Sequence, residues 1–211
     1  MGQIVNIILA VEDRKGNKKV TVYNDQWGIG RKSLLNLLSI HHSLYNKRHD
    51  KSITEEVSLD PQRSGICLEF ELHYNKKGEQ SKKDEVKYPY ENFLSPEWIG
   101  NFIGSYCHNN NGAMVVHIKE TVNRTWNPDV SFRVGFLLGH ADEYYTYDYD
   151  GEVEVYNEEN EKHGKAFSKW LSLEEWCNLD INSTYTDKDF KSIIEAYMKY
   201  FEFDRSDFLF A

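Results

Sequence analysis

Hydrophobic residues follow two different periods along the first part of the chain. Runs rich in valine and isoleucine at 5–11 and 20–23 flank the polar sequence EDRKGNKK, a pattern typical of a β-hairpin. Strict alternation over 66–72 indicates a further strand with one buried face. Leucines recur at helical spacing between these strands, so the pattern predicts an amphipathic helix over 33–46.

The middle of the chain predicts a second helix and two more strands. Ser95 followed by Pro96 is typical of a helix N-cap and first turn, and the sequence NNNG ends that helix. Residues 114–118 and 130–138 predict strands, and we expect the second, almost continuously apolar, to lie in the centre of the sheet. Residues 47–64 are polar and predict a loop with room for one short helical turn.

The last third of the chain predicts a hairpin followed by helices. The sequence EYYTYDYDGEVEVYN alternates around Asp150 and Gly151, a dipeptide suited to a two-residue turn. Ser172 and Glu175 have the spacing of a capping box, and Thr186 precedes a final amphipathic helix.

No repeat, linker or regular strand-helix-strand rhythm divides the 211 residues. We therefore expect one α+β domain over residues 1–211, with a mostly antiparallel sheet and three to four helices.

The longest apolar run, 7–11, is far shorter than the roughly 20 residues of a membrane-spanning helix, and no signal peptide is recognisable, so we expect no membrane contact. Cys67, Cys107 and Cys177 are widely spaced and form no Cys-x-x-Cys motif for zinc, which favours free thiols in a reducing cytosol. We expect a cytoplasmic protein with no metal and no cofactor.

Charge is distributed unevenly along the chain. Residues 1–90 carry 15 basic and 12 acidic residues, a net charge of +3, whereas residues 91–211 carry 10 and 22, a net charge of −12. Nine acidic residues and no Lys or Arg lie between Asp142 and Glu161. Clustered carboxylates repel phosphates, so we expect no direct binding to nucleic acid and a preference for basic protein surfaces.

The predicted hairpin around Asp150 combines tyrosines and acids on one side. With the turn at Asp150 and Gly151, that side carries six residues: Tyr145, Tyr147, Tyr149, Glu152, Glu154 and Tyr156. Tyrosine is favoured at protein interfaces and carboxylates complement Arg and Lys, so this side is the candidate partner-binding surface. The alternative is a solvated edge hairpin that its charge keeps soluble.

Two other segments are candidates for chemistry. His140, Asp142 and Glu143 form a candidate catalytic group, because a histidine and two carboxylates lie within four residues. They also suit the polar end of a strand, where such residues gather without a catalytic role.

The glycine-containing loop before the first predicted helix is a candidate ligand loop. Its residues Gln26, Trp27, Gly28 and Gly30 lie between a strand and a helix, where backbone amides can bind an anion. The loop lacks a complete phosphate-binding motif, and its glycines equally suit a tight connection with Trp27 in the core.

The first thirty residues resemble the start of small proteins encoded by phages and prophages. The resemblance rests on Met1 and Gly2, the hairpin, and a Gln-aromatic-Gly segment at 26–28. Many of those proteins have an Asp between the aromatic residue and the glycine, which this chain lacks. The resemblance implies a viral or mobile-element origin, and hence the cytosol of a host cell, but no activity.

These observations together favour a binding protein over an enzyme. The leading hypothesis is an acidic phage-type accessory protein that binds a basic host protein surface and inhibits a nucleic-acid-handling defence protein, of the anti-CRISPR or anti-restriction type. One alternative is a small metal-dependent hydrolase or nucleotide-processing enzyme that uses His140. The other is a self-assembling structural protein that forms a homo-oligomer through its edge strands or its terminal helix.

Overall fold

The computed structural model describes residues 4–26, 28, 30–45, 51–59, 65–107, 112–121, 129–138, 169–171 and 176. These residues form a six-stranded sheet in the order β3-β2-β1-β4-β5-β6. The strands are β1 (Val5–Glu12), β2 (Lys18–Asp25), β3 (Ile66–Tyr74), β4 (Gly112–Thr121), β5 (Asp129–Leu138) and β6 (Lys169–Leu171).

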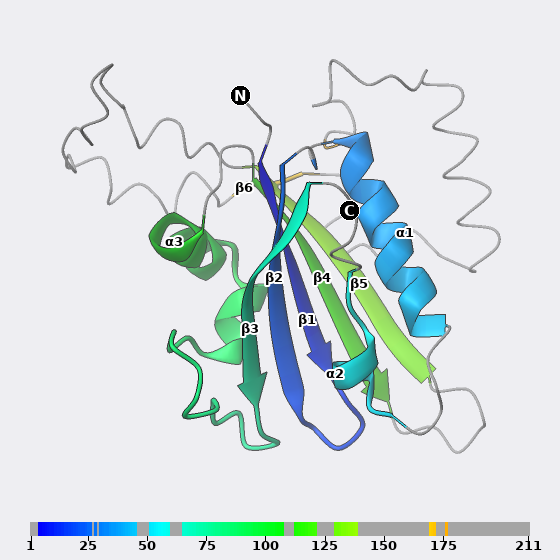
Figure 1. Cartoon of the computed structure of the whole chain (residues 1–211), viewed down its shortest axis with the longest axis vertical. Helices are drawn as coiled ribbons and strands as arrows, with labels where there is room; N and C mark the ends of the chain where they lie inside the picture. Colours follow the sequence, from blue (N-terminus) through cyan, green and yellow to red (C-terminus); the bar gives the residue numbers. More distant parts are fainter. Residues whose placement is uncertain are drawn as a thin grey trace.

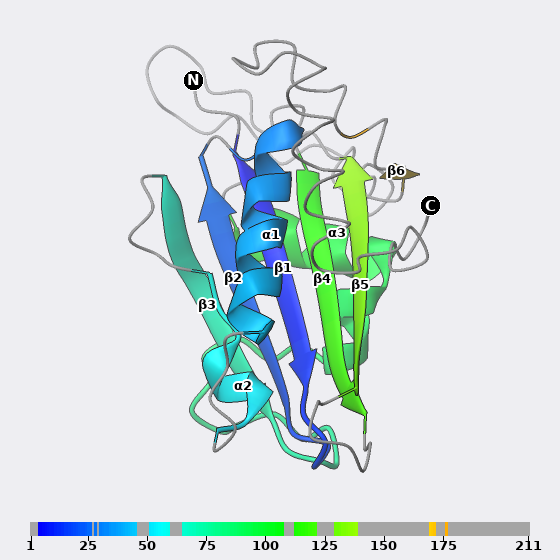
Figure 2. The same cartoon turned by 90° about the vertical axis from the view of Figure 1, so that its right-hand side faces the viewer.

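Helices cover both faces of this sheet. Helices α1 (Arg31–Tyr45) and α2 (Ile53–Glu56) lie on one face, and α3 (Pro96–Tyr106) with the 3₁₀ helix η1 (Tyr90–Leu94) on the other. Figure 1 shows the sheet nearly edge-on between these two layers, and in Figure 2 α1 lies in front of the strands. The described residues therefore form three layers of an α+β fold.

The core is divided into two clusters because β1 is buried on both faces. Ile7 and Leu9 pack in the cluster under α1 and α2, whereas Ile8 and Ala10 pack under α3 and η1. All four side chains are 0% exposed. Successive residues of a strand point to opposite faces, so the continuous apolar run of β1 fills both clusters.

Several predicted elements are confirmed. The N-terminal hairpin, the helix after it, the short helical turn, the alternating strand and the helix from Pro96 all form. Four of the five strand pairs are antiparallel, and the sheet is mostly antiparallel as expected. Ser95 occupies the N-cap position of α3 as expected, but its side chain makes no capping hydrogen bond.

One expectation about the sheet is wrong, and one of its strand pairs was not foreseen. The strand over 130–138 is not central, because β5 lies next to the three-residue strand β6 while β1 and β4 occupy the middle. The pair β1–β4 is parallel, so the chain between them crosses the sheet although the sequence shows no strand-helix-strand rhythm. The predicted hairpin around Asp150, the capping box at Ser172 and the final helix from Thr186 lie outside the described residues.

Within the described ranges, no helix is both long enough and apolar enough to span a membrane.

Candidate functional site: a polar cluster on the sheet

Charged side chains gather at one end of the sheet, on the face that η1 and α3 cover. Strand register brings them together, because Glu12 is the Cα partner of Lys18 in β2 and of Lys119 in β4. His117 of β4 is in turn the partner of Arg133 in β5. Ile8, Ala10 and Val115 pack under η1 and α3, and every second residue shares a face, so Glu12 and His117 continue that face beyond its apolar part.

We refer to these side chains and two from η1 as the polar cluster. Its members come from five elements and are Glu12, Lys18, Tyr90, Glu91, His117, Lys119 and Arg133. The aromatic ring of Tyr90 and the imidazole of His117 lie 6.4 Å apart, measured between their centroids.

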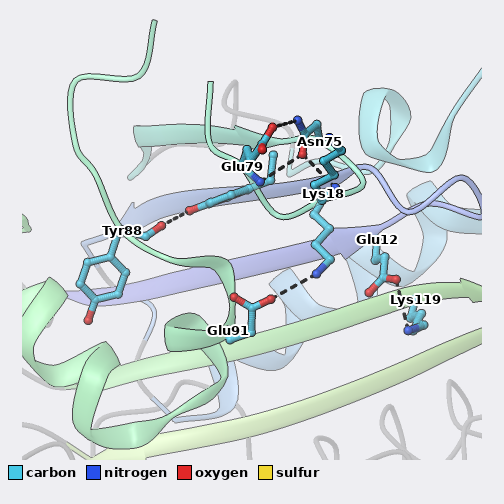
Figure 3. Close-up of polar contacts among 9 residues, drawn as sticks. Glu12, Lys18, Asn75, Glu79, Tyr88, Glu91 and Lys119 are labelled. Atoms are coloured by element: carbon cyan, nitrogen blue, oxygen red, sulfur yellow. Dashed lines mark hydrogen bonds and ion pairs between the residues drawn. The ribbon is translucent and has the colours of Figure 1, made fainter. Parts of the chain in front are cut away.

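Two lysines of the polar cluster form ion pairs. Lys18 Nζ lies 3.3 Å from Glu91 Oε1 and 4.6 Å from the centroid of the Tyr90 ring. Lys119 Nζ lies 3.2 Å from Glu12 Oε1. Figure 3 shows both pairs, with the Lys18 side chain extending from β2 toward Glu91. Partly exposed pairs of this kind contribute little to stability, so their main effect is to position the charges.

Two uncharged groups of the polar cluster are buried without a partner. Among the described residues, the Tyr90 hydroxyl and His117 Nε2 are inaccessible to solvent and make no hydrogen bond. Burial raises the pKa of Tyr90, and the carboxylates of Glu12 and Glu91 raise it further. Burial lowers the pKa of His117 to about 4, and although Glu12 opposes that shift, the cations Lys119, Arg133 and Lys18 reinforce it. Both groups are therefore uncharged at neutral pH.

A second polar group lies at the other end of the same face. Glu69 accepts hydrogen bonds from the side-chain amides of Asn6 and Asn24, each at 3.1 Å. Burial raises the pKa of the Cys107 thiol, and the Glu69 carboxylate adds to that effect. A thiol with a raised pKa is a poor nucleophile at neutral pH, so this group favours a structural role.

The candidate ligand loop uses its backbone for contacts within the chain. The Gln26 amide donates to the Gly65 carbonyl at 2.9 Å, and the Gly28 amide donates to the Asp25 carbonyl at 3.3 Å. A Cβ atom at Gly28 would lie 2.8 Å from the Asp25 side chain, so only glycine fits there without movement. Gly30 has a φ of 62°, which favours glycine, and its carbonyl accepts from Ser33 Oγ at 2.6 Å. Trp27 lies outside the described residues.

The other predicted site residues also lie outside the described ranges. These are the candidate catalytic group His140, Asp142 and Glu143, and the candidate partner-binding residues Tyr145, Tyr147, Tyr149, Glu152, Glu154 and Tyr156. Within the described ranges, no group of three or more His, Cys, Asp or Glu side chains is placed to hold a metal ion.

Sequence reasoning did not find the polar cluster. Its residues are separated by as much as 121 positions, from Glu12 to Arg133, and only the pairing of β1 with β4 brings them together. A local signal was present in β4, where His117 and Lys119 replace apolar residues at the positions that continue Ala113 and Val115. Polar residues on the buried face of a strand need partners, and that requirement could have marked the site.

The fold and the polar cluster define a three-layer α+β protein with an unusually polar end to one core face. Comparison with protein-family models, with curated proteins and with solved structures finds no match to this chain.

Proposed function

We propose that this chain is a binding protein that places its acidic segment, residues 142–161, on a basic surface of another protein. The observation that carries the proposal is the charge pattern, because this segment holds nine acidic residues and no Lys or Arg. A dense group of carboxylates raises the rate and the specificity of association with a surface rich in Lys and Arg.

Ion pairs in the sheet support this proposal. Three lysines of the described strands are paired with acids of neighbouring strands or of η1, namely Lys18 with Glu91, Lys19 with Glu71, and Lys119 with Glu12. These lysines are among the cations that could otherwise neutralise the acidic segment. Because they already have acidic partners, these three lysines are less available to neutralise the acidic segment.

The partner we propose is a nucleic-acid-handling defence protein of a host cell. This chain would then be an inhibitor of the anti-CRISPR or anti-restriction type. Such proteins expose Lys and Arg to bind phosphates, and carboxylates compete for the same cations. The contact residues are the tyrosines and glutamates of 145–156, because tyrosine adds apolar contact area to the charge. A phage or prophage origin, with action in the host cytosol, agrees with the resemblance of the first thirty residues.

Inhibition of purified restriction endonucleases and RNA-guided nucleases tests the proposal. We expect the full chain to inhibit one such enzyme and the variant Glu152→Gln/Glu154→Gln to need a concentration about tenfold higher, equivalent to about 1.4 kcal/mol. Excess DNA and added salt should relieve the inhibition, because both compete for the basic surface.

The matched control is Glu79→Gln/Glu85→Gln, which removes the same charge from the exposed loop after β3. It should inhibit as well as the unchanged chain. Equal inhibition by the two double variants would show that the acidic segment is not the contact surface. Cleavage or hydrolysis that His140→Ala abolishes would instead identify an enzyme.

A further inference from the structure

The polar cluster has the composition of a ligand site, and it lies in a different part of the chain from the acidic segment. We propose that it binds a small oxyanion of the phosphate class through the Tyr90 hydroxyl, the His117 imidazole and the Arg133 guanidinium. This site goes beyond the proposed function, because nothing in the docking of the acidic segment requires it.

The first reason is that two buried polar groups have no partner. Tyr90 is only 2% exposed, yet its hydroxyl makes no hydrogen bond within the described part of the chain. His117 Nε2 is likewise inaccessible to solvent and makes no hydrogen bond within the described part of the chain. Each such group costs about 1–3 kcal/mol of stability, and buried polar groups in native proteins nearly always have partners. A bound ligand with hydrogen-bond acceptors would supply the missing partner to both.

The second reason is the balance of charge. Three cations, Lys18, Lys119 and Arg133, stand against two carboxylates, Glu12 and Glu91. Both lysines are paired, whereas Arg133 is exposed and forms no ion pair with any described residue. With His117 neutral, the cluster has a net charge of +1, which an anion would balance.

The third reason is the arrangement of the donors. His117 of β4 and Arg133 of β5 are register partners on one face of the sheet, and Tyr90 lies over that face from η1, with its ring 6.4 Å from the His117 ring. A phosphate group presents its oxygens in a tetrahedron and can accept from donors both on the sheet and in the layer above it, whereas the two oxygens of a carboxylate lie in one plane. Guanidinium groups also match phosphate oxygens in a two-point contact.

The site has an exposed edge. His117 is only partly buried as a residue, and two of its neighbours, Lys119 further along β4 and Arg133 in β5, are exposed. Lysine and arginine side chains are long and flexible, so an anion can enter from solvent as they move aside. The free ion and the terminal phosphate of a nucleotide share this chemistry.

Titration of the full chain with inorganic phosphate, followed by calorimetry and by NMR of the His117 ring, tests the proposal. We expect saturable binding and a rise of about one unit or more in the measured pKa of His117, because a nearby anion favours the protonated imidazole. Arg133→Gln should weaken binding about tenfold. A parallel titration with a nucleoside monophosphate shows whether the site takes the free ion or the esterified group.

Tyr90→Phe separates a ligand site from a purely structural role. Because the hydroxyl lacks a partner, its removal should leave the melting temperature of the ligand-free protein unchanged or higher, while phosphate binding weakens about tenfold. The control Lys51→Gln removes one positive charge near α2, on the opposite face of the sheet, and should bind phosphate normally.

Three results would overturn the proposal. The first is no saturable phosphate binding with an unchanged His117 pKa, and the second is equal affinity in Arg133→Gln and Lys51→Gln. The third is binding of acetate as tight as that of phosphate, which would remove the phosphate class. None of these results bears on inhibition by residues 142–161, so the two proposals fail independently.

Discussion

Ser33, in the first turn of α1, connects the start of this helix to Trp176, which is distant in the sequence. Its hydroxyl donates to the Gly30 carbonyl and accepts a short hydrogen bond from the indole N–H of Trp176. Trp176 is 0% exposed and stacks on Phe136, with ring centroids 5.3 Å apart. A buried indole N–H needs an acceptor, so this serine fixes where Trp176 packs against α1.

The contribution of this contact can be isolated because α1 contains a second, similar serine. Ser43 Oγ donates to the Ile40 carbonyl at 2.7 Å, as Ser33 Oγ does to the Gly30 carbonyl at 2.6 Å, whereas the indole N–H of Trp176 donates to Ser33. We expect Ser33→Ala to lower the free energy of unfolding by about 1–3 kcal/mol, because it leaves the indole N–H unpartnered. Ser43→Ala should change it by less than about 0.5 kcal/mol. Urea denaturation measures both, and equal losses would contradict the assigned role of Trp176.

The elements that the sequence predicts correctly are those defined by neighbouring residues. The N-terminal hairpin, α1 and α3 follow from patterns that repeat within about ten positions. The parallel pairing of β1 with β4 is not visible in that way, because it joins segments about a hundred residues apart and depends on how both faces of β1 are covered. The polar cluster depends on the same pairing, and for that reason the sequence did not reveal it.

The N-terminal ends of the helices show that prediction from sequence is limited even within a few residues. Ser95 and Ser52 both occupy N-cap positions, but only Ser52 uses its side chain, which accepts from the Thr54 amide at 3.3 Å. Ser52 Oγ also donates to Asp13 Oδ2 at 2.9 Å, and so connects α2 to the turn after β1. Sequence preference identifies the position of a cap, while the rotamer of the side chain decides whether the cap forms.

Alanine substitution should separate these two serines. We expect Ser52→Ala to lower the free energy of unfolding by about 1–2 kcal/mol, the usual effect of losing an N-cap bond. Ser95→Ala should cost less than about 0.5 kcal/mol, because Pro96 already fixes the first turn and no side-chain bond is lost. Thermal denaturation of both variants tests the comparison, and a larger loss at Ser95 would be inconsistent with the observed cap geometry.

Across the whole molecule, each of the two covered faces of the sheet contains a buried or partly buried histidine. His41 of α1 is 4% exposed and packs edge-on against Phe132, with ring centroids 5.1 Å apart. Burial lowers its pKa to about 4, with a smaller contribution from His42. Burial on the opposite face also lowers the pKa of His117 to about 4. Protonation of either imidazole therefore disfavours the folded state.

This pair of histidines predicts how stability depends on pH. Both have a lower pKa when folded than the 6.5 of an unperturbed histidine, so between pH 4 and 6.5 the unfolded chain binds more protons. The stabilisation is therefore complete above pH 6.5 and is lost as the pH falls toward 4. Each histidine contributes up to about 1.4 kcal/mol per pH unit in that window.

Urea denaturation at half-unit intervals from pH 4 to 7.5 measures this dependence. We expect His41→Gln and His117→Gln each to reduce the slope, and the double variant to reduce it most, because each removes one proton taken up on unfolding. His73→Gln is the control, since the His73 side chain is 54% exposed beside Glu71.

Phosphate should act on only one of the two histidines. If phosphate fills the polar cluster, the contribution of His117 to the slope should shrink as phosphate is added, because the bound anion raises the pKa of His117 in the folded state. The contribution of His41, on the other face, should stay unchanged. If neither substitution changes the pH dependence of the unfolding free energy, neither ring is buried in its neutral form.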